Sequence, residues 1–120
     1  MRGAELASRL AQRMQRVVPE GFHTVAEGVF IRFLSDNFPR ESGTWACELA
    51  DRYLEPEALA QAAWLALDDL STFISEATTL PWPGQERMPR PGTEIKEGRI
   101  TLWYGDGQEP VLRLDAIPFE

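Results

Sequence analysis

Apolar residues recur with helical spacing in two long stretches of the chain. In residues 3–17 they are spaced four, four and three apart (Leu6, Leu10, Met14, Val17), which predicts an amphipathic helix. From Pro56 to Thr78 the steps are 4, 3, 4, 3 and 4, which predicts a long helix at the centre of the core. Its apolar positions are Leu59, Ala63, Ala66, Leu70, Phe73 and Ala77, broadened by Trp64, Leu67 and Ile74. A shorter helix is predicted over residues 44–54.

Alternating apolar and polar residues predict five strands. Residues 22–26 and 29–35 form a hairpin around Glu27-Gly28, and residues 93–96, 99–104 and 111–116 form a meander. Two further stretches predict loops. These are residues 36–43, by their composition, and residues 81–92, whose four Pro and two Gly suit neither a helix nor an interior strand.

In chain order these elements read α-β-β-α-α-β-β-β. Helices and strands are grouped rather than alternating, which is typical of the α+β class. We therefore predict an antiparallel sheet of about five strands packed by helices. A chain of 120 residues can bury a core of its own, so residues 1–120 are expected to form a single domain.

Acidic residues outnumber basic ones, 19 against 12, which gives a net charge of −7. Nucleic-acid binding depends on a basic surface and is not expected. The charge is uneven, because residues 1–20 carry four Arg against two Glu, or +2, and the other 100 residues carry eight cations against seventeen anions, or −9. The N-terminal helix therefore has the opposite sign to the body on which it packs.

Cysteine content and hydropathy indicate the compartment. Cys47 is the only cysteine, so no intrachain disulfide can form, which fits a reducing environment. No apolar run approaches the roughly 20 residues of a membrane span. The N-terminal arginines are not followed by the apolar region of a secretory signal. We expect a cytoplasmic protein with no membrane partner.

No catalytic or metal-binding constellation emerges from the residues. His23 is the only histidine and has neither a second ligand nor a nucleophile motif beside it. Asp68 and Asp69 could join Glu76 around a cation, but adjacent residues diverge by about 100° on a helix, so a solvated polar stripe explains them. We expect no catalytic residue, no cofactor and no metal ion.

Two features are candidates for partner binding. Arginines 9, 13 and 16 form a stripe that is either solvated, docked on the acidic body or a second copy of it, or bound to an anionic partner. The proline-framed segment 81–92 carries large apolar side chains that either cover the core or anchor a partner. The candidate partner-binding residues are Arg9, Arg13, Arg16, Trp82, Met88 and Trp103.

Two resemblances bear on the fold. The ending Ile100–Asp106 (ITLWYGD), with Pro110–Leu114 and Ile117-Pro118, resembles small acidic proteins of high-GC actinobacteria, which implies no particular activity. In size, acidity and α+β composition the chain also resembles type III secretion chaperones and YbjN-like proteins. That resemblance implies a dimer that binds segments of client proteins. In this interpretation two strands rather than three precede the central helices, and a C-terminal helix is missing.

The expected function is a non-enzymatic protein-interaction domain, a homodimer acting as adaptor, chaperone or regulator. The alternative is a small-molecule-binding domain or enzyme with a pocket between sheet and helices. Its apolar lining would come from Trp64, Trp103 or Tyr104, and its polar groups from Arg32, Arg99 and His23. A third possibility is an acidic decoy or immunity-type inhibitor that covers a basic partner.

Overall fold

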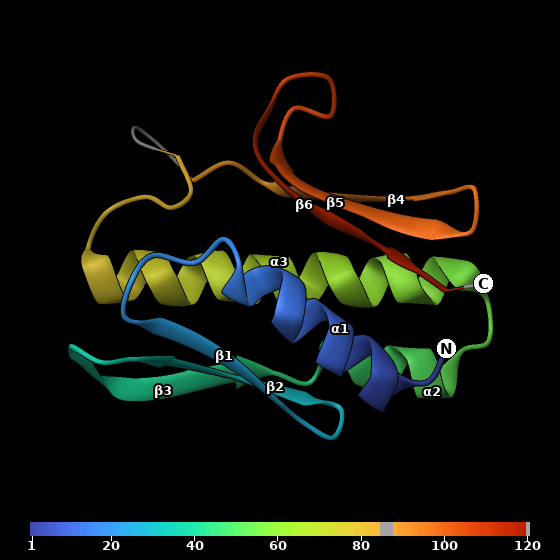
Figure 1. Cartoon of the computed structure of the whole chain (residues 1–120), viewed down its shortest axis with the longest axis horizontal. Coiled ribbons are helices and arrows are strands. Elements are labelled where there is room, and N and C mark those ends of the chain that lie inside the picture. The colour runs from blue at the N-terminus through green and yellow to red at the C-terminus, as the bar shows by residue number, and fades with distance from the viewer. Residues whose placement is uncertain (85–87, 120) are drawn as a thin grey trace.

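A computed structural model of the chain describes residues 1–84 and 88–119. Within these residues the elements follow one another in the order α-βββ-α-α-βββ (Figure 1). They are α1 (Gly3–Gln15), β1 (Phe22–Glu27), β2 (Phe30–Ser35), β3 (Phe38–Thr44), the 3-10 helix η1 (Ala46–Glu48), α2 (Leu49–Arg52), α3 (Pro56–Thr78), β4 (Pro91–Lys96), β5 (Arg99–Gly105) and β6 (Pro110–Pro118). No helix in this described part of the chain has the length and apolar character needed to cross a membrane.

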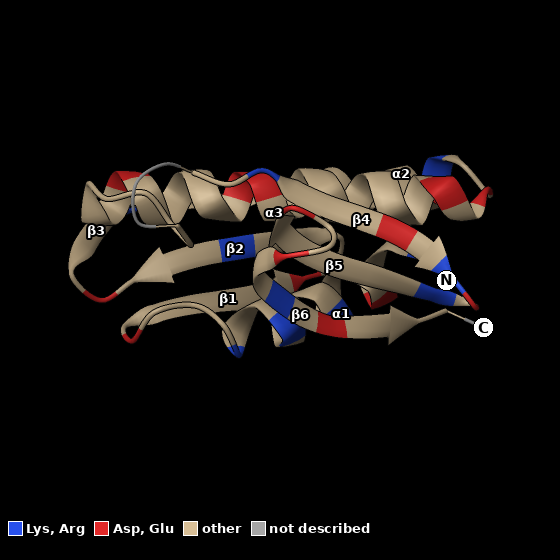
Figure 2. Cartoon of the chain, turned by 90° about the horizontal axis from the view of Figure 1, so that it is seen from above, with Lys and Arg blue, Asp and Glu red and all other residues tan. Residues whose placement is uncertain are grey.

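The strands form two antiparallel sheets, β1-β2-β3 and β4-β5-β6. The α+β class is confirmed, whereas the single sheet of about five strands is wrong. Helices α1 and α3 lie between the two sheets (Figure 1), and the view from above shows them on opposite sides of the molecule (Figure 2). The α1 helix contacts β1 and β6, and α3 contacts β3 and β4. The sheets stay separate because a helix lies alongside their edge strands on each flank.

Strand β3 corrects the loop predicted over residues 36–43. Its residues pair with β2 in antiparallel register, with Arg32 opposite Gly43 and Phe33 opposite Ser42. The polar composition that suggested a loop suits a strand at the edge of a sheet, where Pro39 removes no interior ladder bond. A register shift between Phe33 and Ser35 accommodates the tight connection.

The remaining boundaries differ by a few residues from the predicted ones. The helix predicted over residues 44–54 is divided into η1 and α2, which ends where Tyr53 adopts extended backbone angles (φ −126°, ψ 130°). Strand β4 begins at Pro91, inside the predicted loop, because an edge strand tolerates proline. The first hairpin turns at Gly28-Val29 rather than Glu27-Gly28. The long helix, Pro56–Thr78, is confirmed.

The core lies between the helices and the inner faces of both sheets. Leu6, Leu10 and Met14 enter it from α1, and Leu70 enters it from α3, all of them at most 1% exposed. Tyr104 is fully buried on β5, and its hydroxyl donates to the carbonyl oxygen of Leu67 at 2.6 Å. This bond satisfies a polar group whose burial unpaired would be costly.

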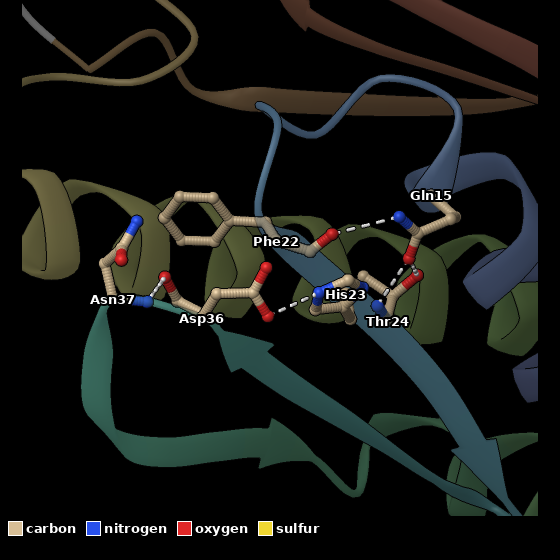
Figure 3. Close-up of polar contacts among 7 residues, drawn as sticks. Gln15, Phe22, His23, Thr24, Asp36 and Asn37 are labelled. Carbon is tan, nitrogen blue, oxygen red and sulfur yellow. Dashed lines mark hydrogen bonds and ion pairs between the residues drawn. The ribbon is translucent and has the colours of Figure 1, made fainter.

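On one side, α1 covers the free edge of β1. The Gln15 amide donates from Nε2 to the Phe22 carbonyl (3.0 Å), and its Oε1 accepts from the Thr24 N–H (2.7 Å) (Figure 3). The side-chain amide therefore supplies the donor and acceptor that a neighbouring strand would supply. An edge covered in this way is not available for pairing with another chain.

On its other side, α1 covers β6 with the arginine stripe. Arg9 Nη1 donates to the Pro118 carbonyl (3.2 Å) and Arg13 Nη2 to the Ala116 carbonyl (3.3 Å). Arg16 Nη1 bonds to the carboxylate of Asp115 (2.7 Å). Residues four apart on a helix rise about 6 Å, close to the roughly 6.8 Å between alternate strand residues, so Arg9 and Arg13 meet alternate carbonyls of β6.

Cys47 gives the fold a predictable response to alkaline pH. Burial raises the pKa of its thiol to about 12, and the Asp51 carboxylate adds to the shift. In the unfolded chain the thiol ionises near about 8.5, so folding favours its neutral form. The stability contributed by this group is complete below that pH. It is lost as pH rises toward 12, by about 1.4 kcal/mol per pH unit.

We therefore expect the free energy of unfolding of the wild type to fall more steeply between about pH 8 and pH 10 than that of a Cys47→Ala variant. Urea denaturation at the two pH values measures both slopes. The loss of the sulfur lowers stability equally at both pH values, so only the difference in slope reports the thiol. Parallel slopes would contradict this assignment.

Candidate interaction surface

The arginine stripe is engaged within its own chain. Its three guanidinium groups contact β6, so the structure places the stripe on the acidic body, one of the alternatives that the sequence left open. Arg9 also pairs with Glu5 on its own helix at 2.9 Å. The stripe is therefore part of the packing of α1 rather than a free basic face.

Trp82 covers the core. Its ring meets that of Tyr104 edge-on, with centroids 5.4 Å apart and planes at 71°. Its backbone N–H donates to Ser75 Oγ at 3.1 Å. Met88, further along the same segment, is exposed. Of the two roles considered for this segment, cover and anchor, the contacts of Trp82 fit a cover. Residues 85–87 of the predicted loop lie outside the described residues.

The residues expected to line a pocket lie on different faces. Trp103 lies on the outer face of its sheet against Gly92, where a Cβ on the glycine would overlap the indole ring. Tyr104 points inward and is fully buried. Arg32 lies on the outer face of the other sheet, bound to Glu27 and to Glu41. Among the described residues, Trp103, Tyr104 and Arg32 therefore do not line one shared cavity.

His23 has one polar partner. Its Nε2 lies 2.9 Å from Oδ1 of Asp36, and both side chains are exposed at the end of the β1-β2 hairpin (Figure 3). An open hollow of about 400 Å³ lies nearby, lined by residues 34–39 and Glu41. No hydroxyl or thiol nucleophile is bonded to the histidine within the described chain. The pair orients one imidazole at the surface.

Asp68, Asp69 and Glu76 do not form an ion site. Across residues 1–84 and 88–119, no three side chains of metal-ligating type come together. Partial desolvation raises the pKa of Asp69, opposed by a hydrogen bond from Thr44, while the negative charge of Asp68 adds to the shift. Asp69 therefore faces β3, whereas Asp68 lies about 100° away around the helix.

The surface that stands out is apolar and lies where α2 meets α3. Leu54 is 96% exposed and Tyr53 is 54% exposed, both in the short connection between the two helices. Leu49 on α2 and Ala58 on α3 flank them and are half-buried. A large apolar side chain left almost entirely in water costs free energy, and clustered exposure of this kind is typical of interaction sites.

Two adjoining hollows extend this surface across α3. The first, of about 520 Å³, is lined by Leu49, Tyr53, Glu55, Glu57, Ala58 and Gln61. The second, of about 490 Å³, is lined by Glu57, Ala60, Gln61, Trp64 and Thr93. They share Glu57 and Gln61, which form the ridge between them. We call the whole area the α3 surface.

Local sequence explains the geometry of the α3 surface. Pro56 is the first residue of α3, a position where its missing N–H has no intrahelical partner to lose. Extended backbone at Tyr53 ends α2 and begins the short connection to α3.

The sequence interpretation assigned Trp64 to the buried face, but it is half-buried on the flank toward β4. The apolar pair Tyr53-Leu54, separated by one residue from Pro56 at the start of α3, was the signal that could have identified this site.

Comparisons of the chain with protein-family models, with curated proteins and with solved structures found no match.

Proposed function

We propose that this chain is a non-enzymatic, cytoplasmic protein-interaction domain, acting as adaptor, chaperone or regulator, and that its partner docks on the α3 surface. The observation that carries the proposal is the nearly complete exposure of Leu54 beside Tyr53. Burying one leucine side chain contributes about 1.5–3 kcal/mol. Leu54 contributes none of this free energy to folding, whereas the apolar residues of α1 and of the inner face of α3 are buried.

The order of elements adds support for the chaperone version of this role. Strand β3 supplies the third strand before the central helices, which the sequence interpretation lacked. No helix follows β6 in the described residues, so the resemblance to type III secretion chaperones stays a prediction. A client segment bound on a surface of two helices is a common mode of peptide recognition.

A homodimer stays a prediction of its own. The arginines expected to hold it donate to β6 of their own chain, so a dimer would need other contacts. Trp45, 61% exposed and packed on Phe30 with ring centroids 4.7 Å apart, lies with the exposed Val25 on or beside the outer face of the β1-β2-β3 sheet. We propose that face as the contact if two copies pair.

Residues that serve binding rather than folding can be replaced without loss of stability. We expect Leu54→Gln to change the free energy of unfolding by less than about 0.5 kcal/mol, because its side chain contributes almost no buried area. Chemical denaturation measures this value. A loss above about 1 kcal/mol would show that Leu54 has a structural role, and the proposed docking site would lose its main support.

Photocrosslinking tests the function itself. A photoreactive amino acid replaces Leu54 in one variant and Val111 in a matched control, since Val111 is also an exposed apolar residue but lies on β6. We expect one discrete adduct from position 54 in the native cell and none from position 111. The adduct is then identified by mass spectrometry and tested by competition with unmodified protein. Equal labelling from both positions, or none from position 54, would refute docking on the α3 surface.

A further inference from the structure

The charge of the partner can be inferred from the charges around the α3 surface. From Tyr53 to Leu80 the chain has no Lys or Arg but five acidic residues: Glu55, Glu57, Asp68, Asp69 and Glu76. Only Glu55 and Glu57 line the α3 surface, and Asp68 continues the same side of the helix. The cation just before this stretch, Arg52, is paired with Glu48 on its own helix. None of the five forms an ion pair within the described residues. Figure 2 shows acidic segments along α3. By contrast, the acidic residues facing α1 and β2 are paired with arginines.

Local helix energetics explain only part of this pattern. Glu57 lies in the first turn of α3, where the helix dipole favours a negative charge. Glu76 lies in the last turn, where the dipole disfavours it, and no basic residue offsets it there. Glu76 lies near the other end of α3 and about 100° around the helix from Glu57, so its charge does not bear on the α3 surface.

The two glutamates beside the apolar hollow set the character of its occupant. Glu55 and Glu57 both line the hollow that Leu49, Tyr53 and Ala58 complete, and both are exposed. An apolar side chain seated there would bring its neighbours within reach of two unpaired carboxylates. Basic neighbours gain Coulomb energy in that position, and acidic ones lose it.

A second copy of the chain fits this surface poorly. A two-fold contact places the same patch on both partners, so it would oppose the glutamates of one copy to those of the other. The net charge of −7 adds to the repulsion. The occupant is therefore a different molecule.

We propose that the partner of the α3 surface presents a cationic amphipathic helix. This inference rests on the proposed function and specifies the chemistry of its partner. One apolar side chain of that helix occupies the hollow beside Tyr53, and another lies against Trp64 across the Glu57–Gln61 ridge. Lys or Arg residues flanking its apolar stripe meet Glu55, Glu57 and Asp68. Such a partner also agrees with the acidic inhibitor of a basic protein that the sequence suggested as a third possibility.

Two synthetic peptides test the inference against the full-length chain. Both have about 14 residues, about four helical turns, with the same leucine stripe. In one peptide all remaining positions are lysine, and in the other they are glutamate. Backbone amide chemical shifts locate the binding site, and titrations at about 50 and 300 mM salt give affinities. We expect the lysine peptide to shift the amide signals of residues 49–65 and to bind more weakly at the higher salt concentration. We expect no binding of the glutamate peptide.

Matched variants separate specific contacts from overall charge. Glu55→Gln with Glu57→Gln should weaken binding of the lysine peptide about fivefold. Glu94→Gln with Glu109→Gln changes the net charge equally on the β4-β5-β6 side and should leave affinity nearly unchanged. Equal losses in the two double variants would overturn the proposal.

The two proposals fail in distinguishable ways. If the glutamate peptide binds as tightly as the lysine peptide at residues 49–65, the cationic partner is refuted while the docking surface stands. If neither peptide shifts those residues but photocrosslinking from position 54 succeeds, the cationic helix is refuted and the interaction function stands. Shifts confined to other faces together with no crosslink refute both.

Discussion

Leu70→Ala is expected to lower the free energy of unfolding by about 2–5 kcal/mol. Leu70 is 1% exposed and lies at the middle of the buried face of α3, among residues from both sheets. Truncation removes apolar contacts and leaves a cavity, because the surrounding helix and strands cannot all move inward. A 120-residue domain has a total stability of about 5–15 kcal/mol, so this loss is a large fraction of it.

Denaturant titration followed by fluorescence measures the Leu70→Ala effect. Leu80→Ala serves as the control, since Leu80 is an exposed leucine just beyond α3. It should change stability by less than about 0.5 kcal/mol. A loss below about 0.5 kcal/mol for Leu70→Ala itself would show that the inner face of α3 is misassigned.

Replacing Arg9, Arg13 and Arg16 together by glutamate is expected to lower the free energy of unfolding by about 2–4 kcal/mol and to promote association. Arg13 accounts for most of the loss, because it is part-buried and its replacement would direct a carboxylate at the Ala116 carbonyl. Arg9 and Arg16 are more exposed and contribute less. Once α1 no longer covers β6, the edge of that strand can pair with another chain.

Docking of the stripe on a second copy, one of the alternatives that the sequence left open, would have the opposite result, because the same substitution would then weaken a dimer. Denaturation measures the stability loss, and light scattering measures mass per particle as a function of concentration. Arg40, Arg99 and Arg113 replaced by glutamate form the control, with the same change in charge at exposed positions. The assignment of the stripe to β6 fails if both triple variants are equally stable and equally monomeric.

The candidate site was only partly predictable from the sequence. The six partner-binding candidates do not form one site. The arginines of α1 bond to β6, Trp82 covers Tyr104, and Trp103 lies against Gly92. Each has the residue type of a binding anchor, but whether such a residue is free depends on what packs against it. The exposure of Leu54 likewise became visible only when α2 and α3 were placed.

The sequence by itself determined the features that depend on residues close along the chain. The period of apolar residues determined α3, alternation determined five of the six strands, and the helical spacing of the arginines placed them on one side of α1. These patterns are local, since neighbours within four residues decide which face is apolar. Strand β3 escaped because an exposed edge strand needs no alternation.

Only the tertiary structure decided how those elements assemble. Arg9 meets Pro118 across 109 residues of sequence, and Gln15 pairs with the edge of β1 as a strand would. The N–H and carbonyl groups at a strand edge bond to any suitable acceptor or donor, so the sequence does not specify whether another strand or a helix side chain supplies that partner. For that reason long-range packing alone decided three features. These are the division into two sheets, the bonding of the arginines to β6 and the apolar surface left on α3.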